Sequence, residues 1–227
     1  LDRNRTRRTL RFGLTHAAEV TASVTPEGLG FRLDLNGVFG TARITLRVPG
    51  LHNARNALCA ATASLAAGAD MAAVTWALSQ FEGVKGRQQI RAGAAGSTII
   101  DDTYNANPDS VRAAIDVLAQ AHGRRLLVLG DMGEVGDQGP AFHREAGLYA
   151  REHGIHALHA LGDAATHAVA AFGDCAHHYP DHAAIAAALR PSLDADTTVL
   201  VKGSRFMRME RVSEALLATT GQDPHAS

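Results

Sequence analysis

Hydrophobic and polar residues alternate along the first fifty positions of the chain, and this period of two predicts short β-strands. Asn36-Gly37 lies between two of the alternating runs and is typical of a two-residue hairpin turn. Pro49-Gly50 ends the block. The strands are expected at residues 19–24, 28–35 and 38–48.

A helical pattern follows from about residue 53. Residues 53–67 are rich in alanine and leucine, and Gly68 is placed to end this helix. Asp70 is placed to cap a second helix that reaches about residue 80. Trp76 lies on that apolar helix, so we expect it in the core. The glycine-containing stretch 81–87 then predicts a hinge or linker, and an ordinary turn is the open alternative.

Beyond the linker, apolar strands alternate with helices, which is typical of a doubly wound, mainly parallel α/β domain of Rossmann-like type. Asn107 is expected to cap one helix, with Pro108 as its first residue. Strands are expected at residues 97–101, 126–129, 157–161, 175–179 and 197–201, and helices at residues 108–121, 140–153, 164–172, 181–189 and 206–218.

The polar residues that end these strands are candidates for a binding site. Ligands of such sheets gather beyond the carboxyl ends of the strands, so these residues should share one rim. They are Asp101-Asp102, Gly130-Asp131, Gly162-Asp163 and Lys202-Gly203-Ser204.

The composition is that of a globular protein with one large domain or two smaller ones. The 227 residues are 46% hydrophobic and 20% charged, with a net charge of −1. This balance provides no basic field for nucleic acid. Five arginines crowd the start of the chain, and a solvated edge is favoured over a phosphate site there. They are Arg3, Arg5, Arg7, Arg8 and Arg11.

The cysteines and the apolar runs bear on location. Cys59 and Cys175 lie far apart and imply no disulfide framework, which favours a reducing cytoplasm. No apolar run approaches the roughly 20 residues that span a bilayer, so no membrane partner is expected. The chain starts at Leu1 without methionine, and we expect it to be part of a longer protein.

Three polar residues mark the junction of the last early strand with the first helix. Carboxamides donate and accept hydrogen bonds at once, which suits the edge of an adenine ring, and an imidazole can stack on its face. The residues are His52, Asn53 and Asn56. The alternative, that Asn53 is only a helix N-cap, stays equally open.

The carboxylates Asp101 and Asp102 end a strand, where acidic side chains of nucleotide-binding folds accept hydrogen bonds from ribose hydroxyls. The alternative is that they only cap a turn. Lys202 and Arg205 flank a glycine at another strand end and could meet a phosphate or a carboxylate. A solvated turn is the alternative there.

Other chemistry has little support in the sequence. The histidines at 153, 156 and 159 are not expected to share a helix face. Cys175, His177 and His178 fall on a strand whose alternate side chains point to opposite faces. We therefore expect no metal site. No Gly-x-x-x-x-Gly-Lys-Ser/Thr phosphate loop and no dinucleotide-binding Gly-x-Gly-x-x-Gly after a strand occurs.

Together these segments resemble the Mur ligase family, over about residues 10–218. Lys85 departs from the family, whose members tend to have proline at that place. The segments that carry the resemblance are Gly50-Leu51-His52-Asn53-Ala54-Arg55-Asn56-Ala57, Gly86-Arg87, Asp101-Asp102-Thr103-Tyr104-Asn105-Ala106-Asn107-Pro108, Gly130-Asp131-Met132-Gly133-Glu134 and Lys202-Gly203-Ser204-Arg205, with Met209-Glu210 after them.

The resemblance implies a division into residues 1–86, the strand-plus-helix tail of the family's central ATP-binding domain, and residues 87–227, its C-terminal domain. It implies an ATP- and Mg²⁺-dependent peptide ligase of peptidoglycan precursor synthesis. The carboxylate of UDP-N-acetylmuramoyl-tripeptide would be activated as an acyl phosphate and joined to D-alanyl-D-alanine. The magnesium ligands would lie mainly outside this sequence, and the 227 residues alone are expected to be inactive and monomeric.

The resemblance also implies roles for ten residues. Adenine would contact His52, Asn53 and Asn56, and ribose would contact Asp101 or Asp102. Arg87 would approach the nucleotide phosphates and Asn105 would face the reacting centre. The substrate-binding residues would be Asn105, Lys202, Ser204 and Arg205.

Two other function classes remain open. A binding module for a nucleotide or a precursor, without catalysis, would be favoured by a native start at Leu1. A Rossmann-type oxidoreductase would be favoured by tight dinucleotide binding, and the missing glycine fingerprint speaks against it.

Overall fold

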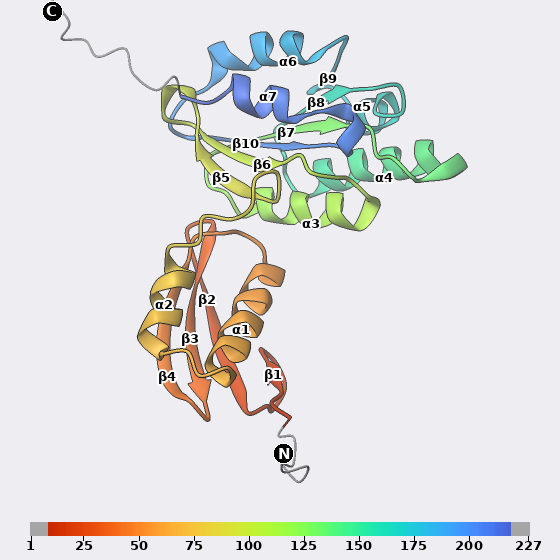
Figure 1. Ribbon diagram of the computed structural model, residues 1–227. Coiled ribbons are helices and arrows are strands. Elements are labelled where there is room, and N and C mark those ends of the chain that lie inside the picture. Colours follow the sequence, from red (N-terminus) through yellow and green to blue (C-terminus); the bar gives the residue numbers. More distant parts are fainter. Residues whose placement is uncertain (1–8, 219–227) are drawn as a thin grey trace, which may run out of the picture. The chain divides into compact units, whose positions relative to one another are not determined.

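The computed structural model describes residues 9–218 and divides the chain into two compact units, Leu1–Glu82 and Gly83–Ser227 (Figure 1). The boundary that was predicted after residue 86 falls inside the second unit. Arg3, Arg5, Arg7 and Arg8 lie outside the described residues. No helix in the span 9–218 combines the length and apolarity that a membrane crossing needs.

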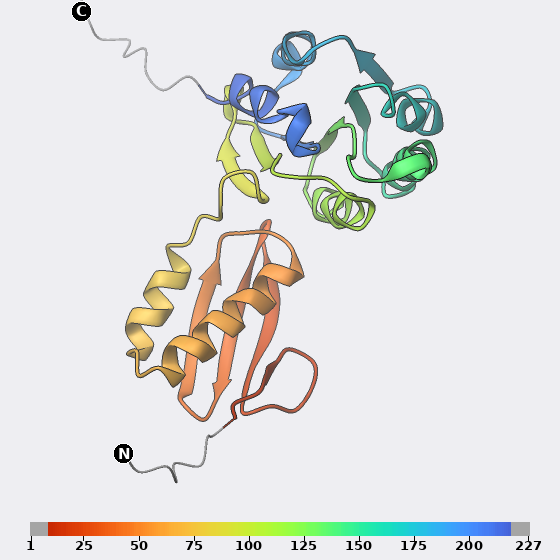
Figure 2. The same ribbon diagram turned by 45° about the vertical axis from the view of Figure 1, so that its right-hand side comes forward.

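The first unit is a four-stranded sheet in the order β1-β2-β3-β4, with two helices on one face (Figure 2). Strands β2, β3 and β4 are antiparallel and β1 runs parallel to β2. Alternate side chains of β2 to β4 face the helices, so the predicted period of two produces the core. The elements are β1 (Phe12–Gly13), β2 (Val20–Glu27), β3 (Gly30–Gly37), β4 (Gly40–Leu46), α1 (Leu51–Ala66) and α2 (Met71–Ser79).

The hairpin between β3 and β4 turns two residues later than predicted. Asn36 and Gly37 belong to β3, and the turn is Val38-Phe39, between paired Gly37 and Gly40. Gly37 is needed for close packing instead, because a Cβ atom there would lie 2.4 Å from the carbonyl oxygen of Glu19. The prediction was wrong because the close approach of the main chain at the start of β2, and not the turn, requires the glycine.

Trp76 is not in the core, contrary to the prediction. Its exposed fraction is 68%, whereas Val74 on the same helix is buried. Two residues along an α-helix correspond to a rotation of about 200°, so Trp76 points away from the face that α2 packs on the sheet. The N-cap prediction for this helix is confirmed, because the Asp70 carboxylate accepts from the main-chain N–H groups of Ala72 and Ala73.

The second unit is the predicted doubly wound α/β fold. Its sheet has the order β5-β6-β10-β7-β8-β9, with parallel pairing except between β5 and β6. The antiparallel edge strand β5 was not predicted. The strands are β5 (Gln89–Ala92), β6 (Thr98–Asp102), β7 (Arg124–Gly130), β8 (Ala157–Leu161), β9 (Ala176–Tyr179) and β10 (Thr197–Lys202).

Helices cover both faces of this sheet. The core cluster on one face joins α6 and α7 to β6, β7, β8 and β10, while α3 and α5 contact the sheet from the other face (Figure 1). Asn107 caps α3 in a capping box with Ser110, as expected for an N-cap followed by Pro108. The helices are α3 (Pro108–Ala119), α4 (Gly139–Glu152), α5 (Thr166–Phe172), α6 (His182–Leu189) and α7 (Glu210–Ala215).

The last helix is shorter than predicted. A single helix over 206–218 is replaced by a 3₁₀ turn at Arg205–Met207, a left-handed residue at Arg208 (φ 51°), and α7. The break lets Met209 fold back and become fully buried against Gly130 and Gly203. Tertiary packing of one apolar side chain thus overrides the local helical pattern.

Candidate functional site

The predicted rim exists, because the polar ends of three neighbouring strands meet through hydrogen bonds. The register pairs Lys202 of β10 with Asp102 of β6. The Ser204 N–H donates to the carbonyl oxygen of Asp131 after β7, at 3.1 Å. We call Asp101, Asp102, Asn105, Lys202 and Ser204 the strand-end cluster.

Lys202 is the central member of the strand-end cluster. Its side chain is only 2% exposed, and its ammonium donates to Asp102 Oδ2 at 2.7 Å and to the Asn105 carbonyl oxygen at 2.9 Å. Burial raises the pKa of Asp102, while the Lys202 ammonium and the main-chain N–H of Gln88 act in the opposite direction. Lys202 therefore ties one strand end to the loop that carries Asn105.

Ser204 makes a second tie to the same loop. Its hydroxyl donates to the Ala106 carbonyl oxygen at 3.1 Å and accepts from the Gly133 N–H at 2.6 Å. Ser204 is 2% exposed. Among the three residues predicted to bind substrate at this strand end, Lys202 and Ser204 are therefore buried and bonded to the protein, whereas the side chain of Arg205 is 72% exposed.

The two aspartates differ in their surroundings. Asp101 is fully buried; its Oδ1 accepts from the Thr103 hydroxyl at 2.7 Å, and its Oδ2 receives no hydrogen bond from residues 9–218. The Asp102 side chain keeps 12% of its surface exposed. Only Asp102 thus reaches solvent at the end of β6.

Arg87 and Asn105 lie at the surface beside these buried groups. The Arg87 guanidinium carbon stands 4.1 Å from the centre of the Tyr104 ring, a cation–π contact. The Tyr104 N–H donates to the Gly86 carbonyl oxygen at 2.9 Å, which holds the two segments together. Asn105 Oδ1 accepts from the Ala106 N–H. The ring of Tyr104 therefore orients Arg87, a contact that the sequence motif did not predict.

The loop after β7 has its own internal anchor, His143, which the sequence analysis did not single out. This fully buried ring lies on α4, and its Nε2 accepts from the Met132 N–H at 2.9 Å. Its Nδ1 is 2.7 Å from the Gly139 carbonyl oxygen and donates to it. Asp131 in turn accepts from the N–H groups of Ala164 and Ala165 after β8. A lone histidine in a helix carries no signal of this role.

In the first unit, His52, Asn53 and Asn56 lie at the start of α1. His52 and Asn56 are exposed and Asn53 is half-buried. Positions three and four apart share a helix face, so the three residues present one polar surface. The idea that Asn53 is only an N-cap is wrong, because Gly50 is the N-cap and Asn53 Nδ2 donates back to the Pro49 carbonyl oxygen at 2.7 Å.

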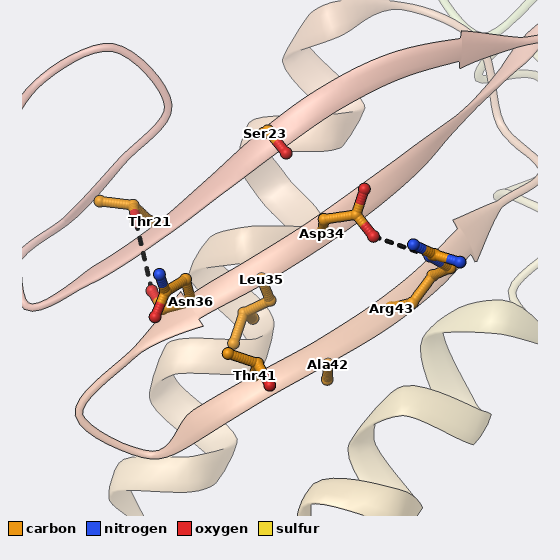
Figure 3. A pocket seen from close by; sticks show the side chains of 8 residues that line it. All are labelled: Thr21, Ser23, Asp34, Leu35, Asn36, Thr41, Ala42 and Arg43. Atoms are coloured by element: carbon orange, nitrogen blue, oxygen red, sulfur yellow. Dashed lines mark hydrogen bonds and ion pairs between the residues drawn. The ribbon is translucent and has the colours of Figure 1, made fainter.

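A pocket with mostly polar lining residues lies at the outer face of the first sheet. The residues of this face alternate with the core residues of the same strands and project away from the helices (Figure 3). Arg43 donates to Asp34 at 2.7 Å across β3 and β4, and the Thr21 hydroxyl donates to the Asn36 carbonyl oxygen. This face is the solvated side of an antiparallel sheet.

The described residues contain no group of three or more histidine, cysteine, aspartate or glutamate side chains placed to hold a metal ion. His159 lies on the sheet with His177 and Tyr179, and burial lowers its pKa to about 4. Cys59 and Cys175 are both exposed and unpaired.

Comparison with known proteins decides the family. The family model described as "Mur ligase, glutamate ligase domain" matches residues 86–205, more than half of the chain. The chain belongs to the Mur ligase family. The resemblance stated from the sequence motifs is therefore confirmed, and so is the α/β fold class.

Among Mur ligases, the chain is 36% identical over 195 residues to the UDP-N-acetylmuramoyl-tripeptide–D-alanyl-D-alanine ligase of Escherichia coli (strain K12). This match covers 85% of this chain and 42% of the E. coli protein. The crystal structure of MurF from Acinetobacter baumannii matches with a TM-score of 0.80 and 30% identity, over 90% of this chain and 47% of that one. MurF from Thermotoga maritima in complex with ADP, at 23% identity, shares the fold (TM-score 0.75, covering 92% and 48%). The chain spans less than half the length of these relatives.

Proposed function

We propose that the chain is part of an ATP-dependent peptide ligase that joins D-alanyl-D-alanine to UDP-N-acetylmuramoyl-tripeptide in peptidoglycan precursor synthesis. The observation that carries the proposal is the 36% identity to the E. coli ligase of that name over 85% of the chain. The strand-end cluster supports it, since a cluster of this kind lies where parallel α/β sheets bind ligands.

In the proposed reaction, a carboxylate oxygen of the tripeptide attacks the γ-phosphorus of ATP and ADP leaves. The dipeptide amine then attacks the acyl carbon, phosphate leaves, and the amine loses a proton to form the amide. Catalysis of both steps depends on positioning and on stabilising the transferring phosphoryl charge.

The second unit offers three groups that reach solvent, the exposed Arg87 and Asn105 and the mostly buried Asp102. Arg87, oriented by Tyr104, is proposed to meet the nucleotide phosphates. Asp102 is proposed as the ribose ligand in preference to Asp101, which has no exposed surface. Asn105, whose main chain is tied down by Lys202, is proposed to face the reacting centre.

The proposed substrate-binding residues divide into two kinds. Lys202 and Ser204 are proposed to act indirectly, by fixing the Asn105–Ala106 segment. Arg205 is the exposed cation at that strand end and is proposed to bind the dipeptide carboxylate. In the first unit, the polar start of α1 with His52, Asn53 and Asn56 is proposed to contact adenine.

The described residues fit the nucleotide ATP better than they fit Mg²⁺. Arg87 and Asp102 suit the phosphate and ribose of a nucleotide. Mg²⁺ prefers several oxygen ligands, and residues 9–218 contain no group of three or more acidic, histidine or cysteine side chains placed to hold a metal ion. No step is therefore assigned to magnesium on this chain. A reducing cytoplasm and a monomeric state remain proposals of the same kind.

The test is a ligation assay with the full reading frame that contains these residues. Tripeptide precursor, ATP and D-alanyl-D-alanine should yield the pentapeptide precursor, ADP and phosphate in equal amounts. Nucleotide or precursor binding with no product would favour the non-catalytic binding module and overturn the proposal. The 227-residue chain, assayed beside it, should form no product, because it contains no phosphate loop.

A further inference from the structure

The turn after β10 presents the neighbouring Arg205 and Phe206 to solvent, between the buried residues Ser204 and Met209, with Met207 half-buried and Arg208 exposed. Phe206 is 65% exposed and the Arg205 side chain 72% exposed, whereas Ser204 and Met209 are at most 2% exposed. A large apolar ring in water is unfavourable. Its position at the carboxyl edge of the sheet, where ligands bind, indicates a use for it.

Two hydrogen bonds and a buried methionine hold this turn in place, so it is preorganised for a ligand. The Met207 N–H donates to the Ser204 carbonyl oxygen at 2.9 Å. His182, at the start of α6, donates from Nε2 to the Met207 carbonyl oxygen at 2.7 Å. Met209 anchors the end of the turn, since a Cβ atom on Gly203 would lie 2.5 Å from its Cγ.

Phe206 lies against the loop that follows β7. A Cβ atom on Gly133 would be only 2.9 Å from Phe206 Cε1, so the ring lies directly over that glycine. The Gly133 N–H donates to the Ser204 hydroxyl, which donates to the Ala106 carbonyl oxygen. The ring is therefore linked through two hydrogen bonds to the segment that carries Asn105, the residue proposed to face the reacting centre.

We propose that Phe206 is the specificity-determining residue for the incoming amine substrate. Arg205 binds the free carboxylate of a short peptide, and the adjacent Phe206 ring covers the small apolar side chain on the same terminal residue. The inference rests on the proposed ligase function and deepens it. It assigns to Phe206 the preference for an acceptor dipeptide with a methyl side chain on its C-terminal residue.

The ligand chemistry matches the exposed groups. Arginine offers a planar pair of N–H donors that fits a carboxylate. The ion pair of Arg205 with Glu210 is long, at 3.8 Å between Nη1 and Oε1, and leaves 72% of the Arg205 side chain exposed to an incoming carboxylate. An aromatic ring beside the cation favours an acceptor with a methyl group over one without it, because burying a methyl against the ring removes apolar surface from water.

The experiment uses the full reading frame and compares D-alanyl-D-alanine with D-alanyl-glycine, which lacks the terminal methyl. One methyl group in an apolar site changes specificity by about tenfold or more. The ratio of kcat/KM for the two acceptors should fall about tenfold towards unity in Phe206→Ala, with KM for ATP and for the tripeptide precursor unchanged. An unchanged ratio in a folded Phe206→Ala would overturn the role of the ring.

A second comparison tests the carboxylate. The amide D-alanyl-D-alaninamide should be a poor acceptor for the unaltered enzyme, and Arg205→Met should remove most of that discrimination. Arg211→Met, an exposed arginine on α7, is the matched control and should keep it. Discrimination that survives in Arg205→Met would contradict the inference. If the unaltered enzyme ligates no acceptor at all, the proposed function fails; if it ligates and the variants behave like it, only this inference fails.

Discussion

Lys202 and Asp102 lie opposite one another on adjacent parallel strands, and their side chains form a buried ion pair of 2.7 Å between Nζ and Oδ2. The same ammonium also donates to the Asn105 carbonyl oxygen. A single buried cation therefore neutralises one candidate ligand and fixes the loop that carries another.

Replacing Lys202 with methionine should lower the free energy of unfolding of the second unit by about 3–5 kcal/mol, because the Asp102 carboxylate would stay buried without its partner. Hydrogen exchange of the β10 amides measures the change. Lys85→Met, which breaks the exposed pair with Glu214, is the control and should have a much smaller effect.

The pH dependence of Lys202→Met adds an independent check. Loss of the cation raises the pKa of Asp102 further above its unfolded value. Because the folded variant binds this proton more tightly than its unfolded chain does, Asp102 contributes stability at pH values below the unfolded pKa, near 4. That contribution is lost as the pH rises. The deficit of the variant should therefore shrink on acidification. A deficit that stays constant with pH would argue against an uncompensated carboxylate.

Tyr104 should matter for nucleotide use through its ring. Tyr104→Leu removes a cation–π contact worth about 0.5–1 kcal/mol at an exposed site, so KM for ATP should rise roughly two- to fivefold in the full reading frame, while Tyr104→Phe leaves it unchanged. Tyr149→Leu is the matched control, because that ring also lies under an arginine, Arg112. An equal loss in Tyr104→Phe would point to the hydroxyl instead.

His159 should make stability fall on acidification. Burial holds its folded-state pKa at about 4, below the ordinary histidine pKa of 6.5, so the unfolded chain binds the proton first. The stability is complete above about pH 6.5 and should fall by on the order of 2–3 kcal/mol as pH approaches 4. Urea titrations at a series of pH values measure this slope. His159→Gln should flatten it, and an unchanged slope would assign it to other groups.

Gly147 should resist substitution although it lies within a helix. Alanine is normally the better helix former by about 1 kcal/mol. A Cβ atom on Gly147, however, would lie 2.2 Å from the Ala168 carbonyl oxygen on α5, so Gly147→Ala should destabilise by about 1–3 kcal/mol. Gly139→Ala, at the start of the same helix, meets only an ordinary 3.4 Å contact and should be nearly neutral in thermal unfolding.

The local patterns of the sequence were sufficient for the second unit's alternation of strands and helices. Five parallel strands, the Asn107 cap and the shared rim of strand ends all follow from short-range periodicity and from the rule that such sheets place their carboxyl ends together. The family motifs also lie in contiguous segments, so the resemblance could be recognised from the chain alone.

Tertiary structure alone decided which way individual side chains face. Lys202 and Ser204, which the sequence named as substrate-binding candidates, are buried, and Trp76, which was predicted to lie in the core, is exposed. The ring of Tyr104 under Arg87, the imidazole of His143 behind the β7 loop and the exposed Phe206 carry no sequence signal. Each of these contacts depends on a partner that is distant along the chain. Hydrophobic periodicity predicts which face of an element a residue lies on, but not which residues pack against that face.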